Sequence, residues 1–257
     1  MQHRVLITGS AGRLGRVAVA ALLARGHDVR GYDVRPTPKL DASQQTVGSL
    51  DDADALAAAM AGGATLIHLA ATPDDAEFPP RGQDNFVADL VPNNIVGPYR
   101  VLEAARRANV SRVMLASTGQ VIDGHLRAGK LPVSALSLPE PRYLYACTKV
   151  FLEALGRVYA EQHGLRVFAV RFGWCPRDLK QVAEIRASAA AQDVYLSPGD
   201  AGRFFVAAVE TPAWPEYAIL YATSRHTHEW KYDLSDAEKL IGYVPQEQWP
   251  TGAEAFD

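Results

Sequence analysis

Residues 5–15 read VLITGSAGRLG, a short apolar run followed by a loop that carries three glycines. Such a run is typical of a strand buried on both faces of a parallel sheet. An alanine-rich helical segment follows at residues 17–23, and residues 28–33 form a second strand-like segment that ends at Asp33. Strand, glycine loop, helix and strand within about thirty residues predict the βαβ unit of a dinucleotide-binding fold.

The three glycines have distinct physical roles. Gly9 permits a tight turn, Gly12 lets the backbone approach a pyrophosphate, and Gly15 lets the helix pack close to the strand. Backbone N–H groups near Arg13 and Leu14 would then face the anion at a helix N-terminus. These five residues are our first candidate cofactor ligands.

Asp33 refines the choice of dinucleotide. A carboxylate at the end of the second strand accepts hydrogen bonds from the adenosine ribose hydroxyls and repels a 2′-phosphate. The sequence therefore favours NAD over NADP as cofactor. Arg13 and Arg35 are nearby cations that could soften this preference.

The rest of the chain alternates strand-like and helix-like segments. We expect strands at 65–69, 112–116, 165–172 and 217–221, helices at 51–61, 94–108, 143–163, 182–191 and 199–209, and loops rich in proline and glycine at 72–84 and 123–141. This pattern predicts an α/β protein: a Rossmann-like, doubly wound parallel sheet with a small C-terminal substrate-binding cap. The NAD-binding core would comprise residues 1–173 and 199–223, and the cap residues 174–198 and 224–257.

Composition excludes several classes of function. The 257 residues carry 26 basic and 29 acidic side chains, a net charge of −3, and no basic run suited to nucleic acid. The apolar stretches fall short of the roughly 20 residues that a membrane span needs. The chain enters its first strand directly after Arg4, so we expect no signal peptide. Cys147 and Cys175 are expected to be reduced thiols, which indicates a cytoplasmic protein.

A catalytic pattern lies in the second half of the predicted core. Tyr145 and Lys149 are four residues apart and project from the same face of a helix. A phenol titrates near pH 10 in water, about three units above neutrality, so it needs a neighbouring ammonium and the positive nicotinamide ring to act as a base. Thr118 follows the strand 112–116, where its hydroxyl could position a substrate oxygen. The three residues suggest proton and hydride transfer.

Several segments resemble the extended short-chain dehydrogenase/reductases, the NAD-dependent epimerase/dehydratase group. The matching segments are TGSAGRLG at 8–15, HLAA at 68–71, NNIVGPYRVLEAARRANV at 93–110, LASTGQVID at 115–123 and YACTK at 145–149. The resemblance implies that Thr118 is the catalytic hydroxyl, Tyr145 the general base, and Lys149 the phenolate stabiliser and ribose ligand. It also implies that Leu69, Ala70 and Ala71 line the cofactor, that Asn94 supports the site, and that Ser49 and Leu50 stand where an acid usually meets adenine.

The chain is similar in particular to the uronate dehydrogenases, over residues 145–173, 195–210 and 224–246. That similarity implies oxidation of a sugar acid at C1 to a lactone by NAD. Uronate dehydrogenases carry Asn-His directly after the catalytic serine, whereas this chain has Gly119-Gln120, so we expect a rebuilt substrate pocket. Arg177 or Arg186 is a candidate ligand for a substrate carboxylate. The candidate substrate-binding residues are Thr72, Ser117, Thr118, Gln120, Cys175 and Arg177.

Other interpretations remain open on the sequence. One alternative is a sugar or nucleotide-sugar epimerase that retains its NAD, and another is a non-catalytic NAD-sensing protein. His226 and His228 are half of a possible metal site, but no third ligand is evident, so we expect no metal. The expected partner is a small carbohydrate-like molecule, with no nucleic acid or membrane. The helices at 94–108 and 143–163 resemble a dimer-forming pair, which predicts a homodimer.

Overall fold

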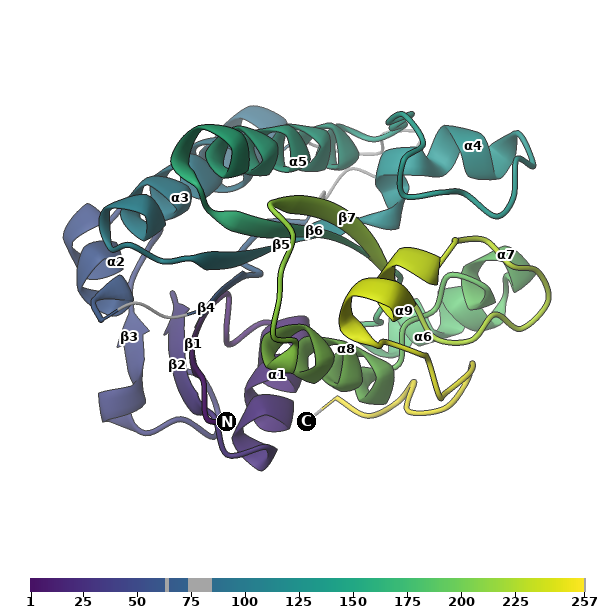
Figure 1. The fold of residues 1–257 in the computed structure, drawn as a ribbon. Coiled ribbons are helices and arrows are strands. Elements are labelled where there is room, and N and C mark those ends of the chain that lie inside the picture. The colour runs from purple at the N-terminus through teal and green to yellow at the C-terminus, as the bar shows by residue number, and fades with distance from the viewer. Residues whose placement is uncertain (63–64, 74–84, 257) are drawn as a thin grey trace.

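The computed structural model describes residues 1–62, 65–73 and 85–256. These residues form a seven-stranded sheet in the order β3-β2-β1-β4-β5-β6-β7 (Figure 1). All neighbouring strands are parallel: β1 (Arg4–Thr8), β2 (Asp28–Asp33), β3 (Gln45–Val47), β4 (Thr65–His68), β5 (Arg112–Thr118), β6 (Arg166–Phe172) and β7 (Tyr217–Ala222). The strand order reverses between β1 and β4, which opens a crevice at their carboxyl ends. The predicted Rossmann-like, doubly wound α/β fold is confirmed.

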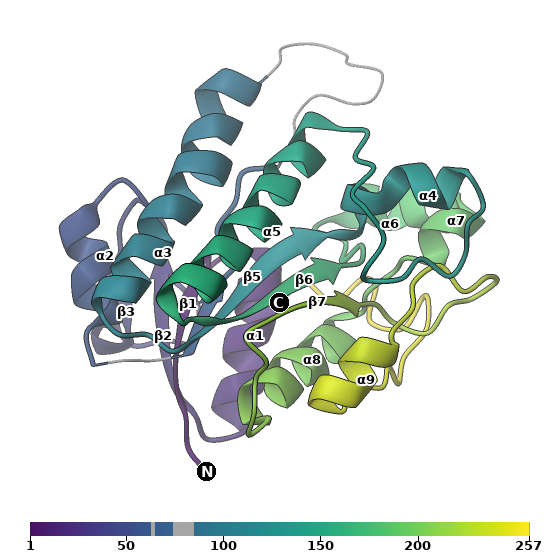
Figure 2. The same cartoon turned by 45° about the horizontal axis from the view of Figure 1, so that its top comes forward.

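Helices cover both faces of the sheet, as the two views show (Figures 1 and 2). One face carries α2 (Ala53–Met60), α3 (Gly97–Arg107) and α5 (Leu144–His163), and the other carries α1 (Arg13–Ala24), α8 (Pro198–Glu210) and α9 (Ser235–Ile241). Each face has its own apolar core. Leu56, Leu102 and Leu152 pack on the first face, and Val19, Phe204 and Phe205 on the second. The two cores explain why the strand sequences are apolar on both sides.

Several local elements differ from the sequence prediction, among them the unexpected helix α9 and the helix expected at 182–191, which is two short helices, Leu179–Arg186 and Ala189–Gln192. Residues 45–47 form the edge strand β3, which is too short and polar to show a strand pattern. The expected loop 123–141 begins with a short helix, α4 (Asp123–Arg127), and residues 74–84 of the expected loop 72–84 lie outside the described residues. The helix expected over 94–108 begins as α-helix only at Gly97, because its first residues belong to a π-helical segment, Phe86–Val96.

Pro92 explains this π-helical segment. Its ring lacks an N–H group and clashes with the carbonyl four residues earlier in an α-helix, so a wider turn accommodates it. The N–H group of Gly97 then bonds to the carbonyl of Pro92, five residues back. Sequence periodicity predicts a regular helix and does not detect such a local widening.

The segment 174–198 and the parts of 224–256 outside α9 lie together beyond the carboxyl ends of β6 and β7. They include the short helices α6 (Leu179–Arg186) and α7 (Ala189–Gln192), and they share a small apolar cluster that contains Ile185, Tyr195 and Ala253. None of the described helices is long and apolar enough to cross a membrane.

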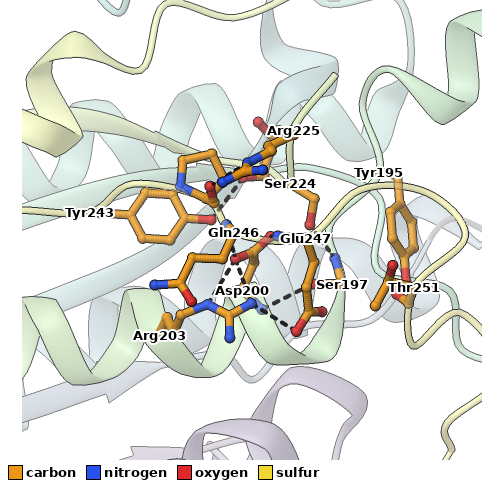
Figure 3. A network of polar contacts seen from close by, with 12 residues as sticks. Tyr195, Ser197, Asp200, Arg203, Ser224, Arg225, Tyr243, Gln246, Glu247 and Thr251 are labelled. Atoms are coloured by element: carbon orange, nitrogen blue, oxygen red, sulfur yellow. Dashed lines mark hydrogen bonds and ion pairs between the residues drawn. The ribbon is translucent and has the colours of Figure 1, made fainter. Parts of the chain in front are cut away.

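A buried carboxylate attaches the C-terminal segment to α8 (Figure 3). Asp200 is fully buried and accepts hydrogen bonds from the backbone N–H groups of Gln246 at 2.8 Å and Glu247 at 3.0 Å. The guanidinium of Arg203 contacts both the Asp200 carboxylate and the Glu247 carboxylate at 2.8 Å. These charge-assisted bonds hold the C-terminal segment against the body of the protein.

Candidate active site

The glycine loop lies at the carboxyl end of β1 and is tightly packed. Gly9 has φ +74°, and a Cβ atom there would lie 2.5 Å from the backbone nitrogen of Ala70. A Cβ at Gly15 would lie 2.1 Å from the carbonyl oxygen of Gly9. At Gly12 the nearest atom would be 3.2 Å away, so this glycine keeps one side of the loop open. The tight turn predicted at Gly9 and the close approach predicted at Gly15 agree with this packing, and the role of Gly12 toward a pyrophosphate stays a prediction.

The N-terminus of α1 offers unpaired donors to an anion. Gly12 is the N-cap and supplies no side-chain acceptor, and the first turn of α1 contains no acidic residue. Among the described residues, the Nε and Nη2 atoms of Arg13 and the Nε atom of Arg16 are buried without a hydrogen-bond partner. Buried donors need acceptors, and a pyrophosphate supplies several anionic oxygens. The residues present therefore fit a dinucleotide here.

A second part of the site lies beside Asp33 at the end of β2. Its carboxylate accepts hydrogen bonds from the N–H groups of Ala11 at 3.0 Å and Arg35 at 3.1 Å, which fixes it against the glycine loop. A cavity of about 280 Å³ begins there, lined among others by Ser49, Leu50, Leu69, Ala70, Ala71 and Thr72. Gly9, Gly12, Leu69 and Ala71 also line a larger cavity of about 780 Å³. The two cavities share these residues and so lie side by side along the carboxyl edge.

The larger cavity brings together the three predicted catalytic residues. Thr118 lies at the end of β5, Tyr145 and Lys149 lie one turn apart near the start of α5, and all three line this cavity with Gly12, Arg13 and Leu14. The Lys149 Nζ atom donates to the carbonyl of Ala116 at 2.8 Å and lies 5.4 Å from the centroid of the Tyr145 ring. A hydroxyl, a phenol and an ammonium therefore share one cavity with the glycine loop.

Burial controls the protonation of these groups. Burial raises the pKa of Tyr145 to about 12, although the positive charge of Arg177 acts in the opposite direction. Burial also lowers the pKa of Lys149 to about 8. From the sequence we expected a lowered pKa for Tyr145 in the presence of Lys149 and an oxidised nicotinamide ring. The protein's own groups instead raise the pKa of Tyr145, so a phenolate at neutral pH needs the additional positive charge of the nicotinamide ring.

The remaining predicted residues have varied surroundings. Gln120, Cys175 and Arg177 line the larger cavity, and burial raises the pKa of the Cys175 thiol, which keeps it neutral. The backbone of Thr72 is held at both its N–H and its carbonyl by the Asn94 amide, each at 2.8 Å. Asn94 therefore shapes the wall of the smaller cavity, beside Asp33, through Thr72.

Two predicted residues are engaged elsewhere in the protein. Ser117 lines the cavity, but its hydroxyl donates to Glu153 at 2.5 Å, within a buried ion pair between Glu153 and Arg171. Arg186 is exposed on α6 and pairs with Glu254 at 2.9 Å, outside the residues that line the cavity. Neither is therefore among the groups that the cavity leaves available to a ligand.

Sequence analysis missed several residues of the cavity wall, namely Pro73, Trp174, Gln181, Val194 and Tyr232. Trp174, Gln181 and Val194 come from the segment after β6, where the sequence shows no motif, and Tyr232 lies in the stretch 224–246, whose similarity to the uronate dehydrogenases did not single it out. His228 bonds to Gln192, and the described residues contain no group of three or more His, Cys, Asp or Glu side chains suited to a metal ion.

Comparisons with known proteins find a matching family model and similar dehydrogenases. The family model for the NAD dependent epimerase/dehydratase family matches residues 5–174. L-arabinose 1-dehydrogenase (NAD(P)(+)) of Haloferax volcanii is 32% identical over 98% of this chain and 99% of its own length, and a uronate dehydrogenase of Pseudomonas syringae pv. tomato is 26% identical over 95% and 82%. The crystal structure of uronate dehydrogenase from Agrobacterium tumefaciens matches with a TM-score of 0.75 and 25% identity, covering 99% of this chain and 87% of that one.

Proposed function

Because the chain belongs to the NAD-dependent epimerase/dehydratase family, we propose that it oxidises a hydroxyl group of a sugar, sugar acid or related polyol with NAD. The observation that carries this proposal is the presence of Thr118, Tyr145 and Lys149 in the same cavity as the glycine loop. A relative named L-arabinose 1-dehydrogenase supports oxidation of a carbohydrate at C1, and relatives named uronate dehydrogenase support a sugar acid as substrate. Oxidation of a cyclic sugar at C1 would give a lactone.

The cofactor would lie along the carboxyl edge of the sheet. The N–H groups of Gly12, Arg13 and Leu14 would hold the pyrophosphate, with the unpaired guanidinium donors of Arg13 beside it. Asp33 would bind the adenosine ribose, and Ser49 and Leu50 would contact adenine. Leu69, Ala70 and Ala71 would line the middle of the cofactor, and Lys149 would reach the second ribose.

The catalytic residues would move one proton. Thr118 and Tyr145 would hydrogen-bond the substrate hydroxyl, and Tyr145 as phenolate would take its proton. When bound, NAD supplies the acceptor for the hydride that leaves the carbon carrying this hydroxyl. Lys149 would stabilise the phenolate by its positive charge. The C–O single bond thus becomes a carbonyl, with the proton on Tyr145.

The segments 174–198 and 224–257 would form the substrate-binding cap on the core of residues 1–173 and 199–223. Arg177 is exposed at the cavity and its charge already reaches Tyr145. We therefore propose that Arg177 binds the carboxylate when the substrate is a sugar acid. Gln120 and Cys175 would contact neutral parts of the sugar.

The test is NADH absorbance during incubation with NAD and a panel of aldoses, uronates and polyols. Sustained NADH formation by the wild type should fall about 10²- to 10⁴-fold in Tyr145→Phe, the range for loss of a general base. The variant should still bind NAD, which separates lost chemistry from lost folding. Bound NAD with no net NADH on any substrate would contradict the dehydrogenase and favour an epimerase.

A homodimer is a further part of this proposal. Tyr99 on α3 and Leu144, Phe151 and Val158 on α5 are large apolar side chains that are at least one-third exposed. The two helices lie side by side on one face (Figure 2). Pairing of these helices between two copies would bury this surface, and a purely monomeric protein in sedimentation at micromolar concentration would contradict it.

A cytoplasmic location is proposed from the two free thiols.

A further inference from the structure

The residue after Thr118 has no space for a side chain. A Cβ atom on Gly119 would lie 2.1 Å from the Oη atom of Tyr232 and 2.8 Å from its Cζ atom. The Tyr232 hydroxyl therefore occupies the position that a side chain at residue 119 would take. Tyr232 comes from the C-terminal segment, yet it lines the same cavity as Thr118, Gln120 and Tyr145.

The Tyr232 ring is held rigidly in this position. It is 4% exposed and stacks on Tyr221, with centroids 4.7 Å apart and planes 9° apart. Tyr221 is itself fixed, because its hydroxyl donates to the carbonyl of Ser134 and accepts a hydrogen bond from Arg171. Free rotation of Tyr232 out of the cavity wall would break this stacking.

The backbone around Tyr232 is clamped as well. Residues 231–233 pair with Val133 in a short parallel bridge, in which Val133 N–H donates to Lys231 at 2.9 Å and Asp233 N–H donates to the Val133 carbonyl at 3.1 Å. Because Val133 belongs to the segment that begins at Gly119 directly after β5, this bridge ties the C-terminal segment to that segment.

The hydroxyl of Tyr232 has unused hydrogen-bonding capacity. Within the described part of the chain it makes no hydrogen bond, whereas the hydroxyls of Tyr195, Tyr217, Tyr221 and Tyr243 all donate to backbone carbonyls. Burial raises the pKa of Tyr232, so the group is a neutral phenol that can both donate and accept. A rigid, neutral and unpaired hydroxyl in a cavity wall is suited to binding a ligand hydroxyl.

We propose that Tyr232 is a specificity-determining residue that hydrogen-bonds the substrate hydroxyl on the carbon next to the one oxidised. The proposal rests on the proposed function, in which the oxidised carbon carries the oxygen bound by Thr118 and Tyr145. Thr118, Gly119, Tyr145 and Tyr232 line one cavity, and we assign to Tyr232 the hydroxyl on the carbon next to the one whose oxygen meets Thr118 and Tyr145. For a sugar oxidised at C1, this is the C2 hydroxyl. Gly119 is required because any side chain would displace the phenol.

The test compares a sugar that the wild type oxidises with its 2-deoxy analogue. Tyr232→Phe should lower kcat/KM for the parent sugar about tenfold, the effect of one hydrogen bond, and should change kcat/KM for the analogue less than twofold. Tyr195→Phe is the matched control, since it removes a hydroxyl from the same region that bonds to the Thr251 carbonyl outside the cavity lining. The control should affect both sugars equally.

A second variant tests the steric part of the proposal. Gly119→Ala should reproduce the selective loss on the parent sugar, because its Cβ would push the Tyr232 hydroxyl out of place. Equal losses on both sugars in Tyr232→Phe would overturn the assignment and leave the ring with a packing role. If the wild type oxidised no sugar and no sugar raised its melting temperature with NAD present, the proposed function and the role of Tyr232 would both fail. If the wild type oxidised the parent sugar but Tyr232→Phe lowered kcat/KM equally for the parent sugar and the 2-deoxy analogue, only the role of Tyr232 would fail and the proposed function would stand.

Discussion

Removing the charge of Glu153 should destabilise the protein strongly. Arg171 donates from Nε and Nη2 to the two carboxylate oxygens of Glu153, both at 2.9 Å, and Ser117 donates to the same carboxylate at 2.5 Å. The side chains of Arg171 and Glu153 are only 1% and 5% exposed. Glu153→Gln therefore leaves a buried guanidinium without a countercharge and replaces one acceptor by a donor.

The expected loss is about 3–5 kcal/mol of unfolding free energy, the usual cost of breaking a buried ion pair by removing one partner. Glu254→Gln is the matched control, because its pair with Arg186 is exposed, with both side chains at 62%, and should cost less than about 1 kcal/mol. Urea denaturation would measure both variants through the shift in midpoint at constant slope.

A double variant separates charge from packing. Replacing Glu153 and Arg171 together by methionine should recover at least half of the loss, since two apolar side chains leave no buried charge. A loss below about 1 kcal/mol for Glu153→Gln would refute the reasoning, because the guanidinium would then have found water or another acceptor. Recovery in the double variant also predicts that β6 and α5 keep their positions without the ion pair.

Three further results are expected. Gly15→Ala should abolish NAD binding and lower stability because its Cβ meets backbone at 2.1 Å, whereas Gly12→Ala should fold and bind NAD more weakly, as thermal shift and fluorescence titration with NADH would show. Asp33→Ala should raise the ratio of kcat/KM with NADP to that with NAD at least tenfold, by removing the repulsion of a 2′-phosphate, and an unchanged ratio would contradict this. For Lys149, burial lowers the pKa from 10.5 to about 8, so the folded protein binds fewer protons between these pH values and the cost of burying the ammonium falls as pH rises. The stability of the wild type relative to Lys149→Met should thus rise by about 1 kcal/mol from pH 7 to pH 9, measured by denaturation at both pH values.

The sequence by itself determined the parts of this protein that depend on local patterns. A buried strand needs an apolar run, a close turn needs glycine, and two side chains one helical turn apart need a spacing of four. Each of these requirements appears within a few neighbouring residues, as in the glycine loop and in Tyr145 and Lys149. The parallel sheet, the glycine loop and the NAD-dependent family are therefore predictable from the order of the residues alone.

Elements with weak local patterns could not be predicted. The edge strand β3 has three residues and little apolar surface, and the widened helix around Pro92 differs from a regular helix only in its hydrogen bonds. The segment after residue 224 shows no period long enough to predict α9, and it is held both by the buried Asp200 carboxylate and by apolar contacts of Ala237, Ile241 and Tyr243.

Only the tertiary structure decided which distant residues meet. Ser117 is used by the buried pair of Glu153 and Arg171, while the hydroxyl of Tyr232 fills the space beside Gly119. The sequence identified Gly119 as a departure from the uronate dehydrogenase pattern but did not show what replaces the missing side chain. Such contacts arise because the strand order and the path of the C-terminal segment bring residues together that are far apart in the sequence. The steric fit between two such residues produces no pattern among the residues next to either of them, so the sequence alone does not predict it.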